Sequence, residues 1–167
     1  KTTFARLLCE KMAALLGGPS VNYYRHMTKP REDFDHVAGY MDGVGSWVQD
    51  RYHLGSLVYG RILGGGCFPS ARRMRIVQAY LRWRGCLTVI FTCSRDTLHE
   101  RLKKSVDKEE MYRHDQILDA GDAYNGLSVS RNVNESYCDH VIDVTDRFPD
   151  DKDAEAIMTM WRARYLR

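Results

Sequence analysis

The sequence has no long apolar run, no paired cysteine motif and no strong excess of charge, and each absence excludes a class of protein. No stretch approaches the roughly 18 apolar residues of a membrane span, and the first residues do not resemble a signal peptide. The five cysteines include no Cys-x-x-Cys pair. This argues against a disulfide framework or a zinc site, and it favours a reducing, cytoplasmic location. A net charge of +3 does not by itself imply a nucleic-acid partner, although it suits an anionic substrate.

The composition that remains is typical of one globular domain. The chain has 167 residues, with 44% hydrophobic and 28% charged residues, which is enough for a single domain with a sizeable core. No internal repeat or linker divides it, so residues 1–167 are expected to form one unit. Cys9, Cys86 and Cys93 lie in apolar stretches and are expected in the core.

Hydrophobic periodicity alternates between the helical and the extended type. Leu7, Leu8 and Met12 share one stripe of the first predicted helix, and Leu87 to Thr92 is a nearly all-apolar run of the kind that forms buried parallel strands. Helices are predicted over residues 3–16, 54–63, 70–83, 97–104, 109–122 and 153–166, and strands over residues 21–24, 87–92 and 141–144, with a short strand ending at Trp47-Val48. Residues 31–41 are expected to be a helix or a loop with a helical turn. Strands alternating with helices predict an α/β fold with a parallel sheet.

An acid and a guanidinium follow the strand that ends at Trp47-Val48. Asp50 and Arg51 then stand at the carboxyl end of a strand, where ligands bind in open α/β sheets. Asp50 can hold a metal-bound water or accept a proton, and Arg51 can grip a phosphate with two parallel hydrogen bonds. The structural alternative is a salt link on the surface.

The first residues match the end of a phosphate-binding motif. That motif has the form Gly-x-x-x-x-Gly-Lys-Ser/Thr, in which the lysine reaches the terminal phosphates and the hydroxyl binds Mg²⁺. Lys1-Thr2 corresponds to its last two residues and opens a helix, whose N-terminus favours anions. The glycines and the preceding strand would lie before Lys1.

Taken together, these stretches resemble the P-loop nucleoside monophosphate kinases, and among them thymidylate kinase and the thymidylate-kinase-like proteins of phages. The resemblance rests on the order of its motifs, from Lys1 to Val144. The segments that carry it are Lys1-Thr2-Thr3-Phe4-Ala5, Asp50-Arg51-Tyr52, Cys86 to Phe91 and Leu98 to Lys104. It implies a three-layer sandwich with a parallel five-stranded sheet, helices on both faces and a small helical lid over about residues 95–125. The central strand would precede Lys1.

The resemblance also implies roles for individual residues. ATP and Mg²⁺ are the implied cofactors. Lys1, Asp50 and Arg51 are the implied catalytic residues, and Thr2 and Asp50 would hold the metal. The residues implied to bind ATP are Lys1, Thr2, Thr3 and the lid residues Arg101, Lys103 and Lys104.

The acceptor is expected to be a deoxynucleoside monophosphate, either dTMP or a related pyrimidine nucleotide. Phe34 and Tyr52 are candidates to stack on its base. Arg51, His53 and Arg72 are candidates to bind its edge or its phosphate, as are Arg25 and His26. For the aromatic residues the alternative is core packing, and for Arg72 it is a solvated helix face.

Two other functions fit the same sequence. A kinase of this kind could phosphorylate a 5-hydroxymethyl pyrimidine base within phage DNA, with the arginine-rich stretch from Arg72 to Arg84 following the backbone of the DNA. The chain could instead be a non-enzymatic nucleotide-binding module. A homodimer is also possible, because thymidylate kinases are often dimers; a membrane partner is not expected.

Overall fold

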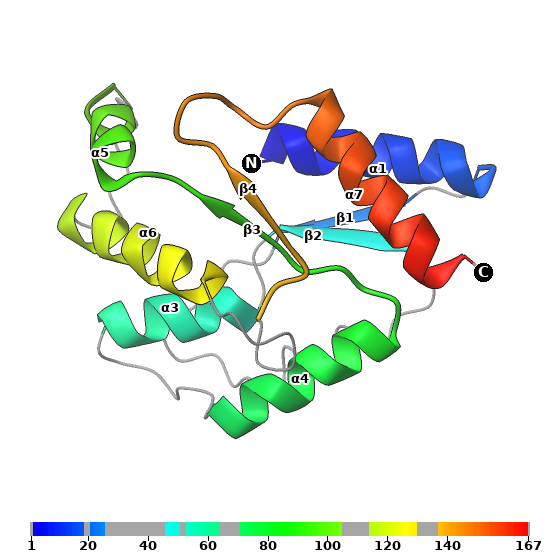
Figure 1. Ribbon diagram of the computed structural model, residues 1–167, viewed down its shortest axis with the longest axis horizontal. Helices are drawn as coiled ribbons and strands as arrows, with labels where there is room; N and C mark the ends of the chain where they lie inside the picture. Colours follow the sequence, from blue (N-terminus) through cyan, green and yellow to red (C-terminus); the bar gives the residue numbers. More distant parts are fainter. Residues whose placement is uncertain are drawn as a thin grey trace.

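The computed structural model describes residues 2–18, 21–25, 46–50, 53–63, 71–104, 114–129 and 137–166, in which helices and short strands alternate (Figure 1). The helices are α1 (Thr2–Leu16), α3 (His53–Leu63), α4 (Ala71–Trp83), α5 (Arg95–Lys104), α6 (His114–Ser128) and α7 (Asp151–Tyr165). The strands are β1 (Asn22–Arg25), β2 (Trp47–Asp50), β3 (Val89–Thr92) and β4 (His140–Asp143). The types of the elements predicted within these ranges are confirmed, although their ends differ. The strand predicted to end at Trp47-Val48 instead begins at Trp47 and runs to Asp50, and the helix predicted to end at 122 runs to Ser128.

The predicted five-stranded parallel sheet, and the three-layer sandwich built around it, are wrong. The described strands have four residues each and form two separate two-stranded parallel sheets, β1–β2 and β3–β4. A sheet is continuous only where neighbouring strand edges come within hydrogen-bonding distance. The two sheets share no such edge among the described residues, most of which are helical. Local periodicity predicted the strands but not how they associate.

The ends of α1 and α7 show why these segments are helical where they are. Gly17 and Gly18 have φ angles of 74° and 128°, and the amide of Gly18 donates to the Ala13 carbonyl at 3.3 Å, which closes the last turn of α1. Asp150 caps the start of α7 by accepting from the amides of Lys152 and Asp153, while the Asp153 side chain accepts from the Asp150 amide. The end of α1 and the start of α7 are therefore determined by residues within a few positions of each other in the sequence.

Two hydrophobic clusters cover opposite faces of the β3–β4 sheet. The first joins α3, α4 and β3 through Leu57, Met74 and Ile90. The second joins α1, β4 and α7 through Phe4, Ile142 and Ile157. Because successive side chains of a strand point to opposite faces, β3 contributes to both clusters, with Ile90 on one side and its neighbours on the other. Figure 1 shows α1 and α7 on one side of these strands and α3 and α4 on the other.

The end of α7 holds the turn that leads from α4 into β3. Trp161 Nε1 donates to the Gly85 carbonyl at 2.8 Å, and the Tyr165 hydroxyl donates to the Cys86 carbonyl at 3.1 Å. The carboxylate of Asp139 is only 3% exposed and accepts from Arg82 Nε at 3.1 Å and from the amide of Thr88 at 2.9 Å. These contacts hold the segment that leads into β3 against α4 and α7.

The three cysteines predicted in the core, Cys9, Cys86 and Cys93, are half-buried, and Cys93 packs against the second hydrophobic cluster. Cys138, which was not part of that prediction, is buried. Burial raises the pKa of the Cys86 thiol to about 11. None of these four residues forms a disulfide with another described residue.

Several predicted features lie outside the described residues. They are Lys1, His26, Phe34, Arg51, Tyr52, the predicted helix or loop at 31–41 and residues 105–113 of the predicted lid segment.

Candidate functional site

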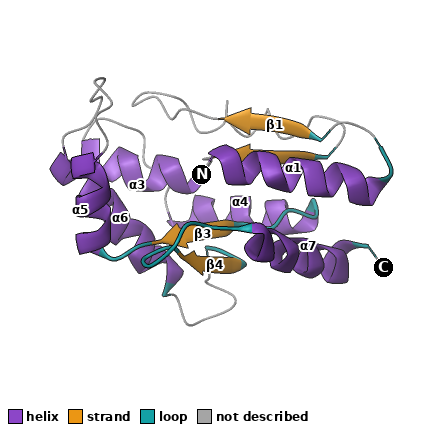
Figure 2. Cartoon of the chain, turned by 90° about the horizontal axis from the view of Figure 1, so that it is seen from above, coloured by secondary structure: helices purple, strands orange, loops and turns teal. Residues whose placement is uncertain are grey.

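The four strands end on the same side of the molecule. Figures 1 and 2 both show β1 and β2 ending beside the start of α1, and the arrowhead of β3 points to this side as well. The parallel register pairs Arg25 with Asp50 at the end of one sheet, and Thr92 with Asp143 at the end of the other. Polar and charged residues therefore stand side by side at the carboxyl ends of parallel strands, where α/β proteins bind ligands.

The first turn of α1 is held against this edge by an aromatic contact. The rings of Phe4 and Phe91 meet edge to face, with centroids 5.5 Å apart and an interplanar angle of 87°. Helix α1 also contacts β1 and β2. Its first turn contains no acidic residue, so the partial positive charge of the helix N-terminus is not neutralised within that turn. Phe4 thus places the N-terminus of α1, which favours anions, near the carboxyl ends of the strands.

The predicted catalytic residues lie at this edge or next to it in the chain. Asp50 is the last residue of β2, and His53 is the first residue of α3. Arg51 and Tyr52 occupy the two positions between them, and Lys1 directly precedes Thr2, the first residue of α1; these three lie outside the described residues. The backbone therefore brings the ends of both predicted motifs to one edge.

Arg72 lies on α4, where its side chain is exposed, and α4 lies across β3 and β4 from α1 (Figure 1). Its predicted contact with the acceptor stays a prediction.

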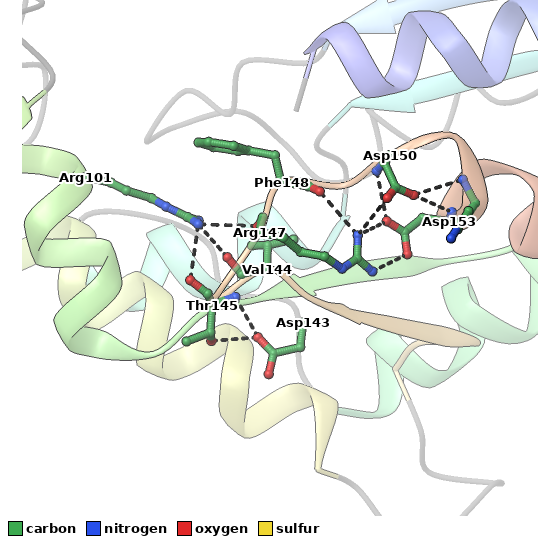
Figure 3. Close-up of polar contacts among 9 residues, drawn as sticks. Arg101, Asp143, Val144, Thr145, Arg147, Phe148, Asp150 and Asp153 are labelled. Carbon is green, nitrogen blue, oxygen red and sulfur yellow. Dashed lines mark hydrogen bonds and ion pairs between the residues drawn. The ribbon is translucent and has the colours of Figure 1, made fainter.

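Arg101 of α5 binds the loop between β4 and α7, which is referred to below as the β4–α7 loop (residues 144–150) (Figure 3). Its Nη2 donates to the carbonyls of Val144, Thr145 and Arg147, at 2.6, 3.3 and 3.4 Å. Its guanidinium carbon lies 4.6 Å from the centroid of the Phe148 ring, and that side chain is 74% exposed. Arg101 thus supports an exposed aromatic ring beside the ends of β3 and β4.

The same loop is tied to both strand ends by polar side chains. Asp143 accepts from the amide and the hydroxyl of Thr145, at 2.9 and 2.7 Å, and these two hydrogen bonds lower the pKa of the carboxyl. The Thr145 hydroxyl in turn accepts from the amide of Ser94 at 2.9 Å. Ser94 follows β3 and its hydroxyl accepts from the amide of Thr97 at 3.2 Å, near the start of α5. The ends of β3 and β4 are therefore joined through one hydroxyl group.

Arg147 anchors the loop to the first turn of α7. Its Nη1 and Nη2 bind the two carboxylate oxygens of Asp153 at 2.5 and 2.7 Å, so the pair is bidentate. The guanidinium lowers the pKa of Asp153 to about 2. Neither Arg147 nor Phe148 was singled out from the sequence. The available signal was their position just after a predicted strand.

The described part of the predicted lid is α5 and most of α6. Lys103 and Lys104 are exposed on α5, and Lys103 pairs with Glu100 at 2.9 Å. Arg95 forms an ion pair with Asp122 of α6 and hydrogen bonds to Asp119. These contacts hold α5 against α6.

Among the described residues, no three side chains of His, Cys, Asp or Glu come together in a way that could hold a metal ion. None of the helices in these ranges has the length and apolar character needed to span a membrane.

Comparison of the chain with protein-family models, with curated proteins and with solved structures finds no match.

Proposed function

We propose that this protein is an ATP-dependent phosphotransferase that moves the γ-phosphate of ATP to a deoxynucleoside monophosphate, either dTMP or a related pyrimidine nucleotide. The observation that supports the proposal most is the meeting of the two predicted motifs at one edge. The start of α1, which follows Lys1, lies beside the end of β2, which precedes Arg51.

The residues at the start of α1 and at the end of β2 fit a nucleoside triphosphate with its Mg²⁺. The first turn of α1 offers backbone amides to phosphate and contains no carboxylate to repel it. Lys1 and Thr3 would hold the phosphates, and the Thr2 hydroxyl and the Asp50 carboxylate would hold Mg²⁺. Bound there, Mg²⁺ would neutralise charge on the phosphates.

The acceptor would be oriented by residues that follow β2. In phosphoryl transfer the protein contributes mainly position and positive charge. Arg51 would fix the acceptor phosphate, Tyr52 or Phe34 would stack on its base, and His53 would meet its edge. Asp50 would orient the acceptor or the metal-bound water.

The ring of Phe148 supplies a described surface for the adenine base. One face of this ring is covered by the Arg101 guanidinium, yet the side chain stays largely exposed. A purine can stack on such a ring. Arg101 would then act on ATP by holding Phe148 and the β4–α7 loop, with Lys103 and Lys104 nearby on the same helix. Because both substrates are cytoplasmic metabolites, a cytoplasmic location goes with this proposal.

The test is a transfer assay with ATP labelled at the γ-phosphate. The protein is incubated with Mg²⁺, labelled ATP and each of the four deoxynucleoside monophosphates, and in a parallel reaction with duplex DNA that contains 5-hydroxymethyluracil. Label in dTDP or another pyrimidine diphosphate supports the proposal. Label in the DNA would replace it with the polymer kinase. Binding of Mg-ATP in a calorimetric titration without any transfer would favour the non-enzymatic module, and absence of both would end the nucleotide assignment.

A further inference from the structure

The outward face of α4 carries exposed cations and exposed apolar side chains together. Arg72 and Arg75 are exposed, and farther along the same helix Ile76 is 59% and Trp83 is 77% exposed. At 3.6 residues per turn, these four positions fall within about a third of the circumference of the helix. They are called here the α4 outer face.

The opposite side of α4 is firmly packed, so the outer face is not exposed through poor packing. Met74 is 0% exposed and Leu81 is 3% exposed, and Met74 belongs to the cluster between α3, α4 and β3. Gln78 is 3% exposed and its Nε2 donates to the Thr88 hydroxyl at 3.1 Å. The orientation of the helix, and with it the direction of the outer face, is therefore fixed.

The charge on this helix has one sign. The stretch from Ala71 to Arg84 contains five arginines and no carboxylate. Of these, Arg82 is directed to the buried Asp139, whereas Arg72, Arg75 and Arg84 are exposed. A row of guanidinium groups with no carboxylate in the same stretch of helix attracts a polyanion and repels a second copy of itself.

The exposed Trp83 at the end of the α4 outer face indicates which kind of polyanion would bind there. The Trp83 ring lies next to Tyr80, with centroids 5.9 Å apart, and most of its surface is open to solvent. An open indole ring beside guanidinium groups is the combination on which unpaired bases stack while cations bind their phosphates. From Arg72 to Trp83 the helix rises about 16 Å, enough for a few nucleotides.

We propose that the α4 outer face binds single-stranded nucleic acid, with Arg72 and Arg75 on the phosphates and Trp83 stacked on a base. A duplex offers the same phosphates but keeps its bases stacked inside, so it would bind more weakly. The inference goes beyond the proposed phosphotransfer and does not depend on it, because α4 lies across the strands from the start of α1 (Figure 1).

The test is fluorescence anisotropy of a fluorescein-labelled 15-nucleotide single strand at a series of salt concentrations, without ATP. Each phosphate contact contributes about 0.7 to the slope of log affinity against log salt for single strands. The double variant R72A/R75A should therefore lower the slope by about 1.4. Trp83→Ala should weaken binding about tenfold and leave the slope unchanged. The matched control is K152A/R162A, which removes two exposed cations from α7 and should leave both quantities nearly unchanged.

Three results would overturn the proposal. The first is an unaltered affinity and slope in R72A/R75A. The second is equal binding of single strand and duplex that Trp83→Ala does not weaken, because stacking would then play no part. The third is a concentration-dependent dimer in sedimentation velocity that Trp83→Ala dissolves, because the face would then bind a second copy. Circular dichroism of each variant confirms that the fold is retained, and phosphotransfer measured in parallel shows whether that activity fails separately.

Discussion

The two strand pairs end at the same side of the molecule, and each places polar residues there. At the end of β3–β4, Asp143 accepts hydrogen bonds from Thr145, and Arg101 donates to backbone carbonyls of the β4–α7 loop. These contacts hold the loop in place. At the end of β1–β2, Arg25 and Asp50 are brought into register directly before the predicted phosphate-gripping Arg51. At the end of β3–β4 such residues serve the fold, whereas a ligand role at the end of β1–β2 is the proposal made for Arg51.

The largest expected difference between the two ends is catalytic. Arg51→Ala should reduce phosphotransfer about a hundredfold, since loss of one charged donor to the reacting groups costs about 3 kcal/mol in the barrier. The thermal midpoint should stay nearly unchanged. The measurement is the initial rate of labelled diphosphate formation, with Arg162→Ala on the exposed side of α7 as the control. A rate equal to that of the unaltered protein would remove Arg51 from the mechanism.

At the other end, the same type of substitution should affect stability first. Arg101→Ala removes hydrogen bonds from a charged donor to three carbonyls of the β4–α7 loop, and it should lower the free energy of unfolding by about 2 kcal/mol. Urea denaturation measures this value. Lys104→Ala, an exposed position on the same helix, should change it by less than about 0.5 kcal/mol. Equal stabilities of the two variants would show that the Arg101 contacts contribute nothing to the fold.

Two glycines of α6 test how tightly this helix packs against α5, beside the end of β3–β4. A Cβ at Gly121 would lie 2.6 Å from Leu98 Cδ2 of α5, whereas a Cβ at Gly126 would meet nothing within 4 Å. Gly126→Ala should stabilise the protein by up to about 1 kcal/mol, because alanine is the better helix former. Gly121→Ala should lose that gain and destabilise by about 1 kcal/mol as Leu98 is displaced. Thermal midpoints that rise in both variants would indicate that the Leu98 side chain can move aside at little cost.

A further expected effect is a dependence of stability on pH at the start of α7. Because Arg147 lowers the pKa of Asp153 to about 2, the ionised carboxylate stabilises the folded state above its unfolded pKa near 3.8. This contribution is lost as the pH falls through the folded value. The stability difference between the unaltered protein and Asp153→Asn should therefore shrink from about pH 4 to about pH 2. Denaturation curves over this range measure it, and a constant difference would mean that Arg147 does not stabilise the ionised form.

The local elements were predictable because their signals are local. The stripe of Leu7 and Leu8 with the glycines at 17 and 18 is enough to define α1, and the apolar run before Thr92 is enough to define β3. The sheet was not predictable in the same way, because pairing depends on which strand edges meet in space. Periodicity gave the strands, and the resemblance supplied a five-stranded arrangement that the described residues do not form.

The candidate site likewise has features that the sequence predicts and features that it does not. Asp50 at a strand end and Thr2 at a helix start follow from sequence pattern alone. The role of Arg101 in holding the β4–α7 loop does not, because its hydrogen-bond partners are more than forty residues away in the chain. The exposed Phe148 ring likewise depends on the path of that loop.

By itself, the sequence determined which segments form helices and strands, the single sign of the charge along α4, and the order of the two predicted phosphate-binding segments. Only the tertiary structure decided that the strands pair in twos, that the start of α1 lies beside the end of β2, and that Arg101 binds backbone carbonyls. The physical reason is the distance along the chain over which each kind of interaction acts. Helix caps and hydrophobic periodicity act within a few residues, whereas strand pairing and the partners of a long charged side chain are set by packing between segments far apart in the chain.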